Sequence, residues 1–292
     1  MITSYAQALE DVVLTRALRH VEKGFWIDVG ANHPYHHSVT KTFWERGWSG
    51  INIEPVSEWF TELVKDRPSD VNLNLAASSF DGFIELHEIA GTGLSTSIER
   101  FASRAQGFVQ RTLTVPCRTL SSICREHVHE EIHFLKIDVE GAEQSVLEGC
   151  DFARFRPWIV VVEATEPLSS TQSHEPWEPI LIGANYDFLL FDGLNRFYLA
   201  SERAELKPAL AFPADDYTRA TDIWTRGAIE IENTQLKQRI ETLEAEISGL
   251  RAKLSTTPTN GIVGLANHLL LSTAAPSHEP HRGCDVGSKQ KL

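Results

Sequence analysis

Two carboxylates of this sequence stand where a strand-like segment gives way to a turn. Asp28 belongs to the apolar run Phe25–Val29, which leads into a tight turn containing Gly30 and Asn32. Glu54 closes the next such run, where a carboxylate can accept hydrogen bonds from both hydroxyls of an adenosine ribose. A glycine in the first turn lets the backbone pass close beneath a ligand, and the following helix offers backbone donors. These residues predict a site for an adenosine-containing cofactor.

The glycine spacing restricts which cofactor this is. A dinucleotide turn needs the pattern G-x-G-x-x-G, so that the backbone can approach a pyrophosphate. Here Gly30 is followed by Asn32 and then by bulky residues, with no second glycine. An adenosine cofactor without a pyrophosphate fits better, and S-adenosyl-L-methionine is the expected one. An NAD(P)-dependent sugar reductase or epimerase is the alternative enzyme, and a plain strand–turn–helix corner with a surface Glu54 is the alternative without a cofactor.

The segments that must position these residues alternate between strand-like and helix-like patterns. This alternation is typical of an α/β protein whose mostly parallel sheet is covered by helices on both faces. Strands are expected at residues 25–29, 51–53, 71–76, 83–87, 133–139, 158–163, 186–191 and 196–200. Helices are expected at 38–46, with Ser38 as N-cap, and along the apolar stripe 56–64. The turn at 192–195 predicts a final antiparallel hairpin.

Several of these segments resemble, in order and spacing, the motifs of the FkbM family of S-adenosylmethionine-dependent methyltransferases. The strongest block is LKIDVEGAE at residues 135–143, continued by VLEG at 146–149. The other matching segments are YAQ at 5–7, IDVGAN at 27–32, IEP at 53–55, TL at 119–120 and FDGLNRFY at 191–198. Together they cover residues 4 to about 200. One departure is Pro34, where the family commonly has glycine.

The resemblance implies a Rossmann-like class I methyltransferase sheet of seven strands, with an antiparallel last strand and the cofactor across the carboxyl ends of strands one and two. Members mostly methylate hydroxyl oxygens, often on sugars of natural products, glycolipids or surface polysaccharides. A carbohydrate or glycolipid acceptor is therefore expected. By position, Asp28, Gly30 and Asn32 would line the methionine side, Glu54 would hold the ribose, Ala77 and Ser78 would meet the adenine, and Asp138 would face the sulfonium. The alternative is a non-catalytic methyltransferase-like scaffold in a glycan-synthesis complex.

An alkyl hydroxyl must lose its proton during methyl transfer, which calls for a general base or a metal. By the resemblance, Asp138 is the first candidate base and Glu140 the second, and Asp138 as a cap of backbone donors is the alternative. His33 beside the cofactor turn is a third candidate. His33 and His37 have the i, i+4 spacing that suits a metal on a helix. Because Pro34 interrupts that helix and no third ligand is specified nearby, no metal site is expected.

The length and charge of the chain limit the classes of protein to which it can belong. The chain of 292 residues has 27 Lys and Arg against 40 Asp and Glu, a formal net charge of −13. This balance argues against a nucleic acid or an anionic membrane as partner, and no apolar run is long enough to span a bilayer. The start carries no basic and apolar leader, and the four cysteines show neither C-x-x-C spacing nor disulfide density. A soluble, reduced, cytoplasmic protein is expected.

The C-terminal part follows a heptad pattern. The a positions are Asn233, Ile240, Ile247 and Leu254, and the d positions are Ile229, Leu236, Leu243 and Leu250. Isoleucine at a with leucine at d favours a two-stranded parallel coil, and one asparagine at a fixes the register. The expected organisation is a methyltransferase-like domain at 1–225, a parallel coiled coil at 226–254 that forms a homodimer or binds a glycan-synthesis enzyme, and a disordered tail at 255–292.

Overall fold

The computed structural model describes residues 3–89, 92–103, 110–214, 221–222, 243 and 247. Contacts group the chain into two units, Met1–Ile229 and Glu230–Leu292. The predicted coiled coil and tail lie outside the described residues, except for Leu243 and Ile247, which are helical and exposed. The dimer and the domain limits at 225 and 254 therefore stay predictions. Within the described part of the chain, no helix is both long enough and apolar enough to cross a bilayer.

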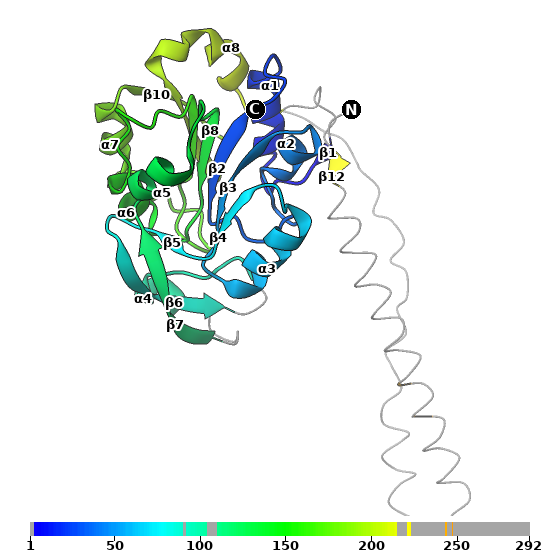
Figure 1. Ribbon diagram of the computed structural model, residues 1–292, viewed down its shortest axis with the longest axis vertical. Coiled ribbons are helices and arrows are strands. Elements are labelled where there is room, and N and C mark those ends of the chain that lie inside the picture. Colours follow the sequence, from blue (N-terminus) through cyan, green and yellow to red (C-terminus); the bar gives the residue numbers. More distant parts are fainter. Residues whose placement is uncertain are drawn as a thin grey trace, which may run out of the picture. The chain divides into compact units, whose positions relative to one another are not determined.

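A seven-stranded sheet forms the centre of the first unit, with the strand order β10-β11-β9-β8-β2-β3-β4 (Figure 1). Its strands are β2 (Phe25–Val29), β3 (Ser49–Ile53), β4 (Val71–Leu73), β8 (Phe134–Ile137), β9 (Ile159–Glu163), β10 (Tyr186–Phe191) and β11 (Asn195–Ala200). The last strand, β11, is antiparallel to both neighbours, whereas the other pairs are parallel. The predicted α/β class with a mostly parallel sheet and an antiparallel last strand is confirmed.

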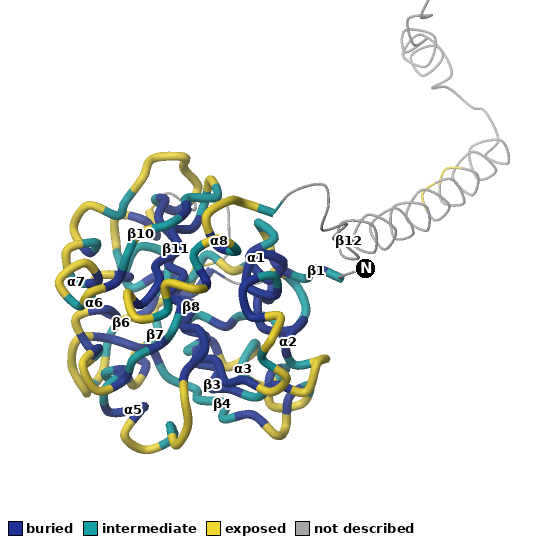
Figure 2. Tube along the Cα trace, turned by 90° about the horizontal axis from the view of Figure 1, so that it is seen from above, coloured by how far each residue is buried: buried dark blue, intermediate teal, exposed yellow. Residues whose placement is uncertain are grey.

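Helices cover both faces of this sheet. One face packs against α5 (Leu120–His127), α6 (Glu143–Glu148) and α7 (Glu178–Gly183). The other packs against α1 (Glu10–Ala17), α2 (Lys41–Glu45), the 3-10 helix η1 (Ser201–Leu206) and α8 (Lys207–Leu210). Side chains alternate between the two layers, so Ile27 belongs to the first and Trp26 to the second. Because both faces are covered, the central strands are mostly apolar and buried along their whole length, in the interior of Figure 2.

A smaller sheet of three strands lies beside α3 (Ser57–Asp66) and is built from β5 (Ala76–Ala77), β6 (Gly82–Ile89) and β7 (Gln110–Arg118). The short helix α4 (Glu99–Ala102) contacts β6, and β1 (Thr3–Ser4) pairs with β12 (Thr221–Asp222). The strand predicted at 71–76 divides between the two sheets. Between β4 and β5, the Asn74 side chain donates to the carbonyls of Glu54 and Pro55.

The helix predicted at 38–46 begins later, at Lys41, and Ser38 is not its cap. The reason is the fully buried guanidinium of Arg67. It donates to Ser38 Oγ at 2.8 Å, to Thr40 Oγ1 at 2.6 Å and to the carbonyl of Pro34 at 2.5 Å. Both hydroxyls that stand ahead of the helix are therefore used as acceptors for a buried cation, and the segment before Lys41 stays non-helical.

Candidate functional site

The site lies where four neighbouring parallel strands end. Gly30 follows β2, Glu54 follows β3, Asp138 follows β8, and Glu163 is the last residue of β9. These strands are adjacent in the sheet and point the same way, so their carboxyl ends share one edge. Ligands of open α/β sheets bind at this edge. The strand order therefore gathers side chains that lie far apart in the sequence.

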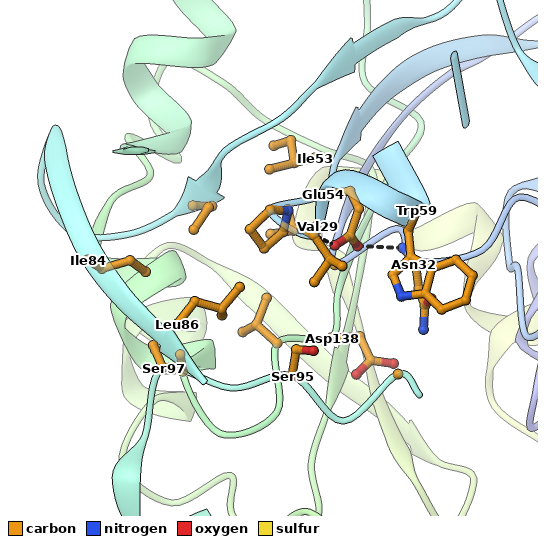
Figure 3. Close-up of a pocket in the computed structure, with 18 of the residues that line it drawn as sticks. Val29, Asn32, Ile53, Glu54, Trp59, Ile84, Leu86, Ser95, Ser97 and Asp138 are labelled. Atoms are coloured by element: carbon orange, nitrogen blue, oxygen red, sulfur yellow. Dashed lines mark hydrogen bonds between the residues drawn. The ribbon is translucent and has the colours of Figure 1, made fainter. Parts of the chain in front are cut away.

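A first cleft opens to solvent at this edge (Figure 3). Its walls are mostly apolar. In Figure 3, Ile84 and Leu86 project from β6, across the cleft from Asn32 and Trp59. The lining residues used below are Val29, Gly30, Asn32, Ile53, Glu54, Trp59, Ala77, Leu86 and Asp138. The first cleft is thus an apolar slot with carboxylates at Glu54 and Asp138.

Glu54 is held by the backbone on both of its carboxylate oxygens. Oε2 accepts from the N–H of Asn32 at 2.8 Å, and Oε1 accepts from the N–H of Val56 at 2.7 Å. Burial raises the pKa of Glu54 to about 7, although these two hydrogen bonds favour the ionised form. The carboxylate is fixed in orientation, and each oxygen keeps acceptor capacity for a further donor. Glu54 can therefore accept hydroxyl groups of a ligand in the first cleft.

The turn after β2 depends on its glycine. Gly30 has φ +78°, and a Cβ there would lie 1.8 Å from the carbonyl oxygen of Asp138. Asn32 also has a positive φ, +49°, a conformation that asparagine tolerates better than most residues. The turn therefore brings the ends of β2 and β8 into direct backbone contact, which places Asn32 and Asp138 in the same cleft.

A second cleft adjoins the first and is strongly acidic. The two clefts share Gly30, Asn32, Gly93 and Asp138 in their linings, so Asp138 stands at their junction. The carboxylates that line the second cleft are Glu10, Asp28, Asp138, Glu140 and Glu163, against the ammonium of Lys136. Thr165, Leu168 and Ser169 line it from the loop after β9. Asp28 lines this cleft and not the first.

Lys136 holds Asp138 in place. Its Nζ donates to Oδ2 of Asp138 and to Oδ1 of Asn195, each at 3.0 Å, and the amide Nδ2 of Asn195 donates to Glu10 at 2.8 Å. Burial alone would raise the pKa of Asp138, but the Lys136 ammonium and hydrogen bonds from Glu163 and Lys136 hold it below its usual value. Asp138 is therefore ionised at neutral pH.

Glu140 and Glu163 complete a cluster with Asp138. One carboxylate oxygen of each lies within 4.8 Å of the others. Burial, followed by the charge of Asp138, raises the pKa of Glu140 to about 8. Burial and the charges of Asp138 and Glu140 raise the pKa of Glu163 to about 11. Glu163 is not among the residues predicted from the sequence, although it stands, like Glu54, at the carboxyl end of a buried strand. Three carboxyls at such short range repel one another unless a proton or a cation lies among them.

Two of the predicted site residues lie outside both clefts. Ser78 points away from the first cleft, which Ala77 does line, and its hydroxyl lies 3.1 Å from that of Ser145. His33 packs against Trp59, with ring centroids 5.6 Å apart, and its Nδ1 accepts from the backbone N–H of Tyr35 at 3.0 Å. Burial lowers the pKa of His33 to about 4. The structure therefore does not bring His33 to the carboxylate cluster, whereas His37 lines the second cleft.

The segment 174–178, in the loop after β9, is anchored in the core. Trp177 is 2% exposed and packs in the core, with its ring centroid 5.9 Å from that of Tyr198. Glu178 begins α7 and accepts from Arg196 at 2.8 Å and from Tyr198 at 2.9 Å. Leu168, which is 64% exposed, lies instead at the second cleft.

Comparison with known proteins agrees with this geometry. No curated protein matches the sequence. Residues 28–190 match the family model of the methyltransferase FkbM domain. The matched region begins in β2 and ends in β10, so it contains Gly30, Glu54, the Asp138 cluster and Glu163. It spans more than half of the chain. This protein belongs to the FkbM methyltransferase family.

Proposed function

We propose that this protein is an S-adenosylmethionine-dependent O-methyltransferase that acts on a hydroxyl of a sugar-containing acceptor. The observation that carries the proposal is the position of Asp138 between two clefts of opposite character. The first is an apolar slot that contains Glu54, a carboxylate placed to bind a ribose, and the second is a polar, acidic cleft. A methyl donor in one and a hydroxyl acceptor in the other would meet at Asp138.

The first cleft fits the methyl donor by the chemistry of its lining. Glu54 presents two oriented carboxylate oxygens that can accept from the two ribose hydroxyls. Ile53, Trp59 and Leu86 offer the apolar surface that an adenine ring needs. Asp138 carries a negative charge that would attract a sulfonium. The pyrophosphate of NAD(P) has no glycine-rich turn here, since Gly30 is followed by Asn32 and bulky residues.

The donor supplies, when bound, a methyl carbon that forms a bond to the acceptor oxygen while the carbon–sulfur bond breaks with its electron pair going to sulfur. The residues of this chain position the acceptor and remove its proton. Asp138 is ionised and held in place by Lys136, so it can accept a hydrogen bond from the acceptor hydroxyl. The proton then passes to a carboxylate oxygen of Asp138 or, above its pKa of about 8, of Glu140.

The second cleft favours a polyhydroxylated, uncharged acceptor. Asp138 is ionised and only accepts hydrogen bonds, whereas the protonated carboxyls beside it can also donate, so the cleft suits a molecule rich in hydroxyl groups. Thr165 and Ser169 add hydroxyls that both donate and accept. The carboxylates repel an anionic ligand, and the bulk charge of −13 acts in the same direction. A neutral sugar of a glycolipid, polysaccharide or glycosylated natural product has the matching chemistry.

The proposal is tested first by cofactor binding. In isothermal titration calorimetry, the wild-type chain should bind S-adenosylmethionine, and Glu54→Gln should weaken binding by about tenfold or more, since charged hydrogen bonds contribute about 1.5–3 kcal/mol. Glu131→Gln is the matched control, because Glu131 lies before β8, away from this edge, and pairs with Arg203. Binding of NADP⁺ in place of S-adenosylmethionine would reject the proposal. Labelled methyl donor with fractions of neutral glycans then identifies the acceptor.

A further inference from the structure

Three carboxylates of the second cleft have the arrangement of a metal-binding site. Asp138 and Glu140 stand in the turn after β8, and Glu163 ends the neighbouring strand β9. One oxygen of each lies within 4.8 Å of the others. A small shift of these side chains brings all three within reach of a single ion, since cation–oxygen distances for divalent metals run from about 2.0 to 2.6 Å.

A second observation points to a ligand at this place. Glu163 is 7% exposed, so more than nine-tenths of it is buried, and it faces the second cleft. Its Oε2 has no hydrogen-bond partner among the residues that the structure describes. An unpaired buried carboxylate oxygen is costly, because its lost hydration is not replaced. The ammonium of Lys136 bonds to Asp138 and Asn195, and a hydrogen bond between Glu163 and Asp138 requires a proton on one of the two carboxyls.

We infer that Asp138, Glu140 and Glu163 bind a divalent cation, Mg²⁺ or Mn²⁺, in the second cleft. Carboxylate oxygens are the ligands that these hard cations prefer, and the cluster contains no sulfur or imidazole that would select zinc or copper. Three protein ligands leave positions open for water or for an acceptor. The cation also adds positive charge to a cleft whose five carboxyls face the single ammonium of Lys136.

This site deepens the proposed function, on which its role in the reaction rests. A cation at Glu163 would lie beside Asp138, where the two clefts join. It would bind the acceptor hydroxyl and make that hydroxyl more acidic. The proton passes to a carboxylate oxygen of the cluster that does not bind the metal, the hydroxyl oxygen bonds to the methyl carbon, and sulfur keeps the electron pair of the broken carbon–sulfur bond. Two adjacent hydroxyls would chelate the ion, so the acceptor class is a sugar with a vicinal diol.

The alternative to a bound cation is a proton shared between Asp138 and Glu163. A measurement of Mn²⁺ binding distinguishes these two hypotheses. The full-length protein, treated with chelator and dialysed, is titrated with Mn²⁺ and followed by electron paramagnetic resonance. One saturable site is expected in the wild type. Glu163→Gln and Glu140→Gln should each weaken it by about tenfold or more, because even groups that only support a metal ligand contribute 10–100-fold. Glu131→Gln, a surface change of the same charge, should bind Mn²⁺ as the wild type does.

Failure of the metal site and failure of the proposed function are distinguishable. If the wild-type chain binds S-adenosylmethionine but shows no saturable Mn²⁺ binding, the metal site is rejected and the methyltransferase proposal is unaffected. Equal Mn²⁺ affinity in the wild type and both cluster variants overturns it as well. Mn²⁺ binding that depends on Glu140 and Glu163 supports it, even if the methyl donor does not bind. Circular dichroism of each variant confirms that the compared proteins are folded, and Glu140, which is more exposed than Glu163, is the variant least expected to unfold.

Discussion

The ammonium Nζ of Lys136 lies 3.0 Å from the carboxylate Oδ2 of Asp138, at the edge of the sheet where both clefts meet. Lys136 is buried and Asp138 is 31% exposed on its side chain, so the cation is fixed and the carboxylate reaches the ligand space. The lysine also bonds to Asn195 of β11. This pair therefore connects the strand that carries the site to the antiparallel strand beyond β9.

Replacing Lys136 by methionine should lower kcat by about 10–100-fold, since a carboxylate displaced by as little as 1 Å loses that much. Without the ammonium, the pKa of Asp138 rises, so the acid limb of the kcat–pH profile should move to higher pH. The loss of stability should be about 1–3 kcal/mol, below that of a fully buried pair because Asp138 is partly exposed.

Lys41→Met is the matched control for this change. Lys41 is equally buried and lies near Glu45 and Asp66, but it lines neither cleft. It should lose stability in urea unfolding while kcat and its pH profile stay as in the wild type. An unshifted acid limb in Lys136→Met would contradict the positioning role of Lys136.

Cofactor affinity should rise with pH through Glu54. Burial raises the pKa of Glu54 to about 7, so the carboxyl of the free protein is protonated below that pH. Because an ionised carboxylate is needed to accept both ribose hydroxyls, the affinity should increase by about tenfold per pH unit up to about pH 7 and then level off. Calorimetry between pH 5.5 and 8.5 measures this slope.

Glu54→Gln should remove the slope, since an amide does not titrate in this range. The raised pKa of Glu54 has the opposite effect on the stability of the fold, which falls as pH rises. The folded state keeps a proton that the unfolded chain releases, so this contribution is full below the usual pKa and is lost as pH rises through about 7. A pH-independent wild-type affinity would show that Glu54 does not contact the cofactor.

Alanine substitutions at two glycines with similar backbone conformations distinguish the cost of backbone strain from the cost of a steric clash. Gly30 and Gly47 have φ +78° and +82°, but only at Gly30 would a Cβ meet backbone, 1.8 Å from the carbonyl of Asp138. Gly47→Ala should cost about 1–2 kcal/mol, the strain of a left-handed residue. Gly30→Ala should cost clearly more in urea unfolding and should also weaken cofactor binding, because the ends of β2 and β8 must separate. Equal costs at the two positions would refute the close approach.

The predicted coiled coil is tested by oligomeric state. Leu243 occupies a d position and is helical and 41% exposed, so a partner is expected to cover it. Leu243→Pro should convert a dimer into a monomer in light scattering, because proline breaks the helix at its centre. Ser272→Pro, in the predicted tail, should leave the mass unchanged. A wild-type monomer, or a Leu243→Pro dimer, would disprove pairing through this segment.

Local pattern in the sequence was sufficient for the central strands and for much of the first cleft. Mostly apolar runs that end in a turn predict β2, β3, β8 and β9, because a strand buried on both faces is rich in apolar residues. The same runs place Gly30, Glu54 and Asp138 at strand ends, and the structure brings all three to one cleft. The resemblance to the FkbM family is confirmed by the match over residues 28–190.

The tertiary structure alone decided which side chains share a site. Glu163 joins Asp138 because β9 pairs with β8, a neighbour relation that no local pattern encodes. Ser78 and His33 are predicted from the sequence as site residues, yet contacts with Ser145 and Trp59 hold them outside both clefts. Spacing along the chain fixes where a strand ends, whereas the burial of Arg67 and Lys136 and the order of strands fix which charges face each other. The acidic cluster is therefore a product of strand order.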